Sequence, residues 1–167
     1  LNAIYRNLLS GVEADLIDGR ARIVDANTVA VGDQHYTTRK ILIATGGWPY
    51  IPPFPGSELA VTSNEIFDLE AFPQRLVIVG GGYIAVEFAG IFNGLGANVT
   101  QLYRGPLFLR GFDSDIRAHA VQEIRKTGVD LRFETNVTEI SHGADGLDVT
   151  LTDGSVISAD TVLYATG

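Results

Sequence analysis

The chain has 167 residues, of which 46% are hydrophobic and 19% are charged, and its formal net charge at pH 7 is −8. This composition predicts a folded protein with a buried core, and the acidic balance speaks against a general affinity for nucleic acids or anionic lipids. The chain contains no cysteine, which excludes a disulfide framework, a thiolate metal site and a cysteine nucleophile within it.

Targeting signals are not evident in the sequence. No apolar stretch approaches the roughly 20 residues that cross a bilayer, and residues 1–10 lack the profile of a secretory signal. We therefore expect a soluble, cytoplasmic protein without membrane contact. The chain has no methionine, which indicates a piece excised from a longer protein.

The first third of the chain predicts a helix followed by a small antiparallel meander. Apolar residues at helical spacing predict a helix over residues 1–9. Strands are expected over residues 16–24, 28–31 and 36–44, with turn residues between them. Four of the six prolines then fall in residues 46–56, which predicts an ordered connection with a domain boundary just after it.

The middle of the chain predicts a strand, a helix and a second strand in the order of a parallel crossover. Thr62 and Glu65 have the spacing of a capping box ahead of a short helix. An all-apolar strand over residues 76–79 runs into glycines, and an amphipathic helix starts at Tyr83. The next strand is expected over residues 98–103, so the unit has the length of a right-handed crossover.

The last third predicts one more helix and strand and then hairpins. Asp113 is expected to cap a helix through about residue 126, followed by a parallel strand over residues 129–133. Asp-Gly pairs predict antiparallel turns further on, and a last strand is expected over residues 161–165. The sequence thus predicts an α/β fold that combines a parallel sheet with an antiparallel β-meander.

The glycine-rich turn after residues 76–79 points to a function. Gly80, Gly82 and Ala85 follow the pattern G-x-G-x-x-A, and Ile84 lies within the same segment. The first glycine allows a tight turn, the second admits a pyrophosphate close to the backbone, and the small third residue lets helix and strand pack. The helix start offers free N–H groups to phosphates. We expect dinucleotide binding here, whereas the alternative is a glycine turn that serves packing alone.

Two arginines indicate which dinucleotide is bound. In an NAD site an acidic residue usually ends the second strand, and its carboxylate accepts a hydrogen bond from the ribose 2′-hydroxyl. Here Tyr103 and Arg104 end that strand, and Arg110 follows. Two guanidinium groups suit a 2′-phosphate, so NADPH is expected over NADH. The alternative is that both arginines are solvated surface charges.

Four segments of the chain closely resemble the middle of glutathione reductases of bacteria and plants, within the class I pyridine nucleotide-disulfide oxidoreductases. They are ILIATGGWPYIPPFPG, VTSNEIFDL, VIVGGGYIAVEFAGIFNGLG and LYRGPLFLRGFD. The resemblance implies a Rossmann-like NADPH-binding domain inserted into an incomplete FAD-binding domain. Residues 1–61 would be the end of the first FAD portion, residues 62–157 the NADPH domain, and residues 158–167 the return into the FAD domain.

The resemblance also implies roles for individual residues. Thr45-Gly46 and Thr166-Gly167 would be the crossings between the two domains, next to the cofactors. Tyr83 resembles the tyrosine that covers the nicotinamide pocket, and the alternative is a half-buried core aromatic. Glu87 resembles the glutamate near the flavin that pairs with a lysine outside this chain, and the alternative is a carboxylate favoured by the first turns of a helix.

The activity that the resemblance implies passes a hydride from NADPH to FAD, then reduces a redox-active disulfide, whose thiols reduce glutathione disulfide. Such enzymes are homodimers. The chain lacks the FAD glycine loop and the cysteine pair, so alone it is expected to bind NADPH weakly and to reduce nothing. A mercuric, trypanothione or dihydrolipoamide-type reductase, and a nucleotide-binding module without enzymatic activity, remain alternatives. The three histidines are too scattered to predict a metal site.

Overall fold

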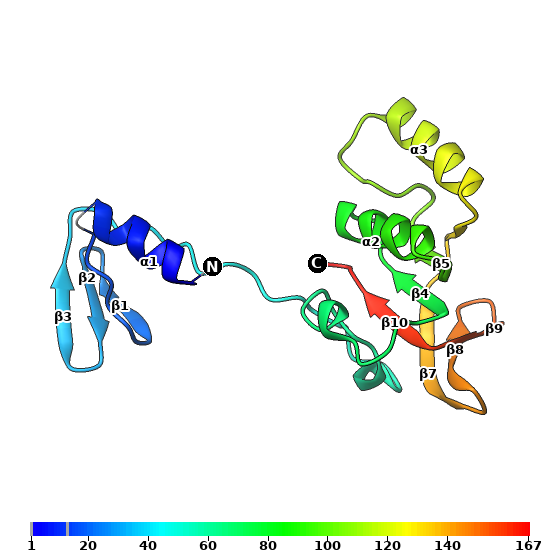
Figure 1. Cartoon of the computed structure of the whole chain (residues 1–167), viewed down its shortest axis with the longest axis horizontal. Helices are drawn as coiled ribbons and strands as arrows, with labels where there is room; N and C mark the ends of the chain where they lie inside the picture. The colour runs from blue at the N-terminus through cyan, green and yellow to red at the C-terminus, as the bar shows by residue number, and fades with distance from the viewer. Residues whose placement is uncertain (1, 13) are drawn as a thin grey trace. The chain divides into compact units, whose positions relative to one another are not determined.

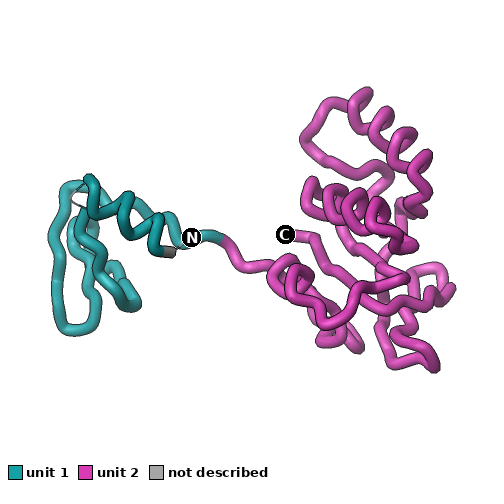
Figure 2. The backbone as a smooth tube through the Cα atoms, viewed as in Figure 1, with its two compact units in different colours: residues 1–46 teal, residues 47–167 magenta. Residues whose placement is uncertain are grey.

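The computed structural model describes residues 2–12 and 14–167, and the chain divides into two compact units. Figure 2 colours them separately: Leu1–Gly46 is the first unit and Gly47–Gly167 the second. The division falls at the start of the proline-rich connection, and the assignment of enzyme domains at residues 61 and 157 stays a prediction.

The first unit is a helix with a three-stranded antiparallel sheet (Figure 1), as the sequence predicts. The helix is α1 (Asn2–Gly11), and the strands pair in the order β1 (Ala21–Asp25), β2 (Thr28–Val31) and β3 (Gln34–Thr37). The turn residue Asn27 is held by Asp25, whose carboxylate accepts the Asn27 N–H at 2.8 Å. An Asx turn of this kind explains why the chain reverses between β1 and β2.

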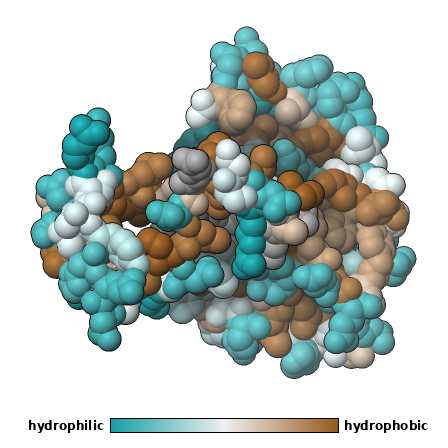
Figure 3. Space-filling model, turned by 60° about the vertical axis from the view of Figure 1, so that its left-hand side comes forward, coloured by the Kyte–Doolittle hydropathy of each residue, from teal (hydrophilic) through white to brown (hydrophobic). Residues whose placement is uncertain are grey.

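Two strand bounds predicted for this unit are wrong. Residues 16–20 precede β1 without strand structure, and β3 ends at Thr37 although the prediction continued to residue 44. Leu42 is 88% exposed and Ile43 65% exposed, and Figure 3 shows apolar side chains among the polar ones on the surface it presents. A strand-like sequence forms a strand only beside a partner strand, and none pairs with residues 41–44 within the part of the chain that is described.

The second unit is built on a four-stranded parallel sheet in the order β10-β4-β5-β6. Residue register pairs Val79 of β4 with Leu102 of β5 and with Tyr164 of β10, so all three strands end at one edge. Helices α2 and α3 cover one face of this sheet, and an antiparallel sheet, β7-β8-β9, covers the other (Figure 1). The bounds are β4 (Arg75–Val79), α2 (Tyr83–Gly94), β5 (Asn98–Tyr103), α3 (Ser114–Lys126), β6 (Asp130–Phe133), β7 (Val137–Gly143), β8 (Gly146–Leu151), β9 (Val156–Ala159) and β10 (Thr161–Tyr164).

Two hydrophobic cores explain why β4 is apolar throughout. Leu76 and Ile78 point into the core shared with α2 and α3, and Val77 and Val79 point into the core shared with the antiparallel sheet. Because successive side chains of a strand alternate between its faces, a strand covered on both sides must be apolar at every position. The predicted combination of a parallel sheet and a meander is confirmed.

The connection from residue 47 to residue 74 is ordered without long elements. It contains two short 3₁₀ helices, Ser57–Leu59 and Ile66–Asp68. The predicted capping box is present, because the Glu65 carboxylate accepts from the N–H of Thr62 at 2.7 Å and from its hydroxyl at 2.6 Å. The helix that follows it is only a single 3₁₀ turn.

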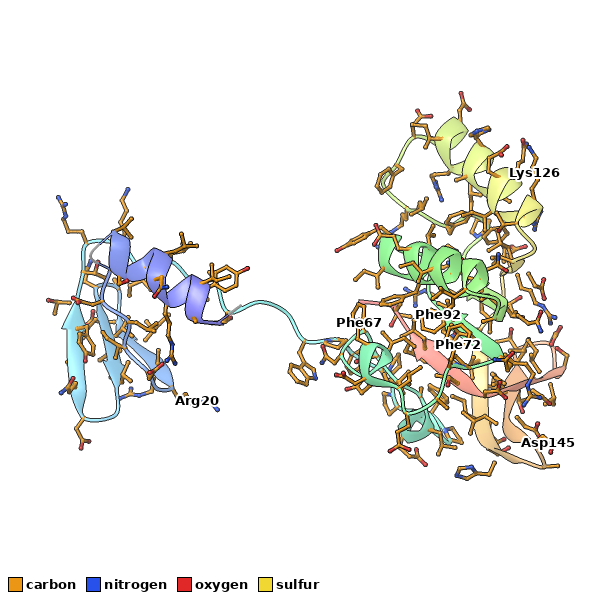
Figure 4. All side chains as sticks on the ribbon, in the orientation of Figure 1. Arg20, Phe67, Phe72, Phe92, Lys126 and Asp145 are labelled. Atoms are coloured by element: carbon orange, nitrogen blue, oxygen red, sulfur yellow. The ribbon has the colours of Figure 1, made fainter. Side chains whose placement is uncertain are left out.

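Aromatic side chains hold the end of this connection against α2. Phe67 lies 5.4 Å from Phe88, and Phe72 stacks on Phe92 with ring centroids 5.6 Å apart (Figure 4). Phe88 and Phe92 are one helical turn apart on the buried face of α2. The predicted apolar stripe of this helix therefore binds both the sheet and the connecting segment.

Arg75 and Asp160 form an ion pair at the start of β4. Arg75 Nε donates to Asp160 Oδ1 at 3.0 Å, and Asp160 Oδ2 accepts the backbone N–H groups of Gln74 and Arg75, both at 2.8 Å. Arg75 Nη2 also donates to the carbonyl of Asp145, in the turn between β7 and β8 (Figure 4). The pair therefore joins both sheets of the second unit.

We expect Asp160→Asn to lower the free energy of unfolding at pH 7 by about 1 kcal/mol. Hydrogen bonding to Arg75 holds the pKa of Asp160 below its ordinary value of 3.8. The stabilisation is therefore complete above about pH 4 and is lost as the pH falls through the lowered pKa of the folded state. Urea unfolding of wild type and variant should thus give stabilities that differ at pH 7 and converge below pH 4.

Asp130→Asn is the matched control for this prediction. Asp130 pairs with Arg132 at 2.8 Å, but both side chains are more exposed, at 49% and 40%. An exposed pair contributes little, so this variant should unfold like the wild type. A difference at Asp160 that persisted unchanged at pH 3 would contradict the assignment of the stabilisation to its charge.

Candidate dinucleotide-binding site

A cleft of about 930 Å³ lies at the carboxyl edge of the parallel sheet. Open α/β sheets bind ligands at this edge, because loops and helix starts meet there. All of the lining residues belong to the second unit. They come from the connection, from the ends of β4, β5 and β10 with the turns and loops that follow them, and from the start of β7: Tyr50, Pro52, Pro53, Phe54, Val79, Gly80, Gly81, Gly82, Leu102, Tyr103, Arg104, Gly105, Arg110, Asn136, Val137, Tyr164, Thr166 and Gly167.

Gly80 makes the turn from β4 toward α2 in a conformation that only glycine readily adopts. Its φ is +148°, and a Cβ placed on it would lie 2.3 Å from the carbonyl oxygen of Ala165. Its N–H donates to the carbonyl of Leu102 at 2.9 Å. The same Cβ would lie 3.3 Å from that of Ala85, which is fully buried. Gly80 and Ala85 therefore serve the tight turn and the close packing that the motif predicts.

Gly82 differs from Gly80 because the described residues leave room for a side chain at this position. Its backbone is extended at φ −82°, and a Cβ there would meet no atom within 4 Å. It is the N-cap of α2, and no side chain of the described residues caps this helix start. The first N–H groups of α2 therefore lack side-chain acceptors at a position that is open to the cleft, which is the arrangement that binds phosphate groups.

The two arginines also meet at this cleft. Arg104 follows the last residue of β5, and Arg110 lies in the loop before α3. Both are exposed residues that line the cleft, and neither forms an ion pair with any described residue. Two guanidinium groups and the start of α2 therefore line the same cleft, and each of these features favours an anionic ligand.

The other predicted site residues lie around the cleft in different ways. Thr166 and Gly167 line it, and the Thr166 hydroxyl donates to the carbonyl of Tyr50 at 3.3 Å. Thr45 and Gly46 belong to the first unit. The roles of all four as crossings between domains stay predictions.

Tyr83, Ile84 and Glu87 lie in the first turns of α2 and are not lining residues of the cleft. Tyr83 is 62% exposed, which disagrees with the alternative that it is a half-buried core aromatic. Glu87 is exposed as well. The contacts of Tyr83 and Glu87 with nicotinamide and flavin stay predictions.

Aromatic residues of the cleft are the part of the site that the motifs missed. The Tyr103 ring covers Gly81, where a Cβ would lie 2.3 Å from Tyr103 Cδ2. Tyr164 is 4% exposed and its ring centroid lies 5.4 Å from that of Phe54. Burial raises the pKa of Tyr164 to about 12. Tyr103 and Tyr164 each end a parallel strand, which is the signal that could have placed both at this edge.

Metal sites and membrane spans are absent from residues 2–12 and 14–167. No three His, Asp or Glu side chains of this part of the chain are grouped so that they could hold a metal ion. None of the helices described for it has both the length and the apolar character needed to cross a membrane.

Comparisons with known proteins match this chain over its whole length. The family described as pyridine nucleotide-disulphide oxidoreductase matches residues 1–167. The chain belongs to this family. Among curated members of the pyridine nucleotide-disulphide oxidoreductases, glutathione reductase of Burkholderia cepacia is 45% identical over 167 residues and that of Nostoc sp. is 44% identical over 169. Both alignments cover 100% of this chain, which spans 37% of the length of each relative.

A solved structure of a flavoprotein disulfide reductase supports the fold. The HOCl-induced flavoprotein disulfide reductase RclA from Escherichia coli is similar with a TM-score of 0.85 and 33% sequence identity. The similarity covers 99% of this chain and 39% of that one. The expected resemblance to the pyridine nucleotide-disulphide oxidoreductases is therefore confirmed, and so is the α/β fold class.

Proposed function

We propose that this chain is the NADPH-binding part of a flavin-dependent disulfide reductase whose substrate is glutathione disulfide. The observation that carries the proposal is the convergence of the glycine turn, the uncapped start of α2 and both arginines on one cleft. The sequence identity of 45% and 44% between this chain and two glutathione reductases supports the choice of substrate.

NADPH fits the chemistry of this cleft. The open space at Gly82 would admit the diphosphate to the first N–H groups of α2. Arg104 and Arg110 would bind the 2′-phosphate, whose oxygens accept paired hydrogen bonds from guanidinium groups. Tyr83, exposed one residue after Gly82, would cover the nicotinamide. Bound NADPH supplies a hydride, and the residues of this chain orient the nucleotide and exclude water.

The remaining parts of the reaction belong to the full-length protein. We propose FAD as its second cofactor, a redox-active disulfide that this cysteine-free chain does not contain, and a homodimeric assembly. Residues 62–157 would be the NADPH domain, between FAD-domain portions at residues 1–61 and 158–167. Glu87 would lie near the flavin.

Nucleotide titration of the 167-residue chain tests the proposal. Isothermal calorimetry should show binding of NADPH at least about ten-fold tighter than that of NADH, since two charge-assisted contacts add to the affinity. The chain alone should give no reduction of glutathione disulfide. Equal affinities for the two nucleotides, or no binding of either at millimolar concentration, would contradict the assignment of the cleft.

The substrate needs a test in the full-length protein. NADPH oxidation should be fastest with glutathione disulfide when it is compared with trypanothione disulfide, lipoamide and mercuric ion. A higher kcat/KM for one of the other three would reject glutathione disulfide as the substrate while leaving the nucleotide site in place.

A further inference from the structure

We propose that Arg117 is a positioning residue that sets the preference for NADPH over NADH. It would do so by holding the loop before α3 in the conformation in which Arg110 binds the 2′-phosphate. The inference rests on the proposed function of the cleft. Arg117 lies in the first turns of α3 and is not itself a lining residue of the cleft, so its effect on the nucleotide would be exerted through the loop.

The contacts of Arg117 are unusual for an arginine at the surface. Its side chain is half-buried, its Nε donates to the carbonyl of Phe108 at 2.7 Å, and its Nη2 donates to the carbonyl of Leu107. It forms no ion pair with a described residue. The planar fork of one guanidinium thus binds two successive carbonyls of the loop, and a lysine could not reproduce both hydrogen bonds in this geometry.

Two other anchors act on the same stretch of loop. Phe108 is fully buried and stacks on Phe133 with ring centroids 5.7 Å apart. The N–H of Leu109 donates to the carbonyl of Gly81 at 2.6 Å. The loop is therefore bound to the hydrophobic core, to the glycine turn and, through Arg117, to α3.

The residue before Arg110 shows that this shape is imposed on the loop. Leu109 has φ +57°, a left-handed conformation that is unfavourable for a leucine and persists only where the surroundings enforce it. Arg110 follows directly, so the direction in which its side chain leaves the backbone depends on the enforced conformation. Removal of one anchor would let the loop relax and would displace Arg110 from the cleft.

Calorimetry with NADP⁺ and NAD⁺ on the 167-residue chain tests the role. Arg117→Ala should raise the dissociation constant for NADP⁺ by about ten-fold, because small displacements of a binding group cost that much or more. The dissociation constant for NAD⁺ should change by less than about two-fold. Arg117→Lys keeps the charge but loses the fork, so it should also bind NADP⁺ more weakly than the wild type.

Lys126→Ala is the matched control. Lys126 lies at the other end of α3 (Figure 4), is 69% exposed in its side chain and contacts Glu123. Its removal takes the same charge from the same helix without touching the loop, so both nucleotides should bind as they do to the wild type. Loss of NADP⁺ affinity in this control equal to that of Arg117→Ala would overturn the proposal in favour of a long-range charge effect.

The outcomes separate this inference from the proposed function. A wild-type chain without preference for NADP⁺ would reject the 2′-phosphate site itself. A wild-type preference that survives in both Arg117 variants would overturn the positioning role alone. Equal weakening of both nucleotides would also overturn it, because a residue that only stabilises the fold affects them alike. Should Arg117→Ala unfold at the assay temperature, the Lys variant carries the same comparison.

Discussion

Replacing both Arg104 and Arg110 by alanine should raise the dissociation constant for NADP⁺ by about 100-fold and leave that for NAD⁺ within a few-fold. Both side chains line the cleft and are free of ion pairs with described residues, so they would offer their N–H groups to the doubly charged 2′-phosphate. NAD⁺ carries a hydroxyl at this position and gains little from them. Calorimetry at constant ionic strength measures both constants.

A variant with the same loss of charge is available in the first unit. Arg39 and Lys40 are adjacent exposed residues, and their double replacement by alanine removes two positive charges from another part of the chain. This control should bind NADP⁺ like the wild type. If the Arg104 and Arg110 variant weakened NAD⁺ as strongly as NADP⁺, a specific site for the 2′-phosphate would be ruled out.

The second large effect is expected at Gly82. Gly82→Ala should fold like the wild type, because the added methyl group meets no protein atom within 4 Å. It should nevertheless weaken both NADP⁺ and NAD⁺ by about ten-fold or more, since the methyl group would stand where the diphosphate approaches the backbone. Thermal unfolding and calorimetry on the same sample separate the two effects.

Gly80→Ala is the contrasting variant from the same turn. Its Cβ would lie 2.3 Å from the carbonyl oxygen of Ala165 at a φ of +148°, and both the clash and the backbone strain destabilise the folded state, by about 2–4 kcal/mol in total. We therefore expect lowered thermal stability here and wild-type stability at Gly82. Wild-type nucleotide affinity in the Gly82 variant would show that the diphosphate binds elsewhere.

Local patterns were sufficient for much of the second unit. The all-apolar run of β4 predicted a strand covered on both faces, and the two cores of the structure have this arrangement. Asp113 was predicted to cap α3, and its carboxylate accepts the N–H groups of Asp115 and Ile116 at 2.9 and 3.4 Å. Such features depend on residues close in sequence, whose geometry local propensity and capping determine.

The first unit shows where local patterns fail. Residues 41–44 have the composition of a strand but lie exposed without a partner among the described residues. A strand forms its hydrogen bonds with another segment of the chain. Strand propensity therefore shows that a segment can pair, but it does not show whether a partner strand is available. The capping box at Thr62 and Glu65 likewise predicted that a helix begins there, but it did not predict that the helix is a single 3₁₀ turn, Ile66–Asp68.

For the candidate site, the sequence by itself determined the glycine turn, the helix start behind it and the two arginines that follow the second strand. Only the tertiary structure decided that these groups line one cleft with Tyr103 and Tyr164. It also decided that Arg117 donates a hydrogen bond to the loop between the two arginines. The physical reason is the separation in sequence of the residues that interact. Turn and capping geometry arise within a few residues, whereas a cleft and a hydrogen bond to a distant carbonyl exist only once separate elements have packed together.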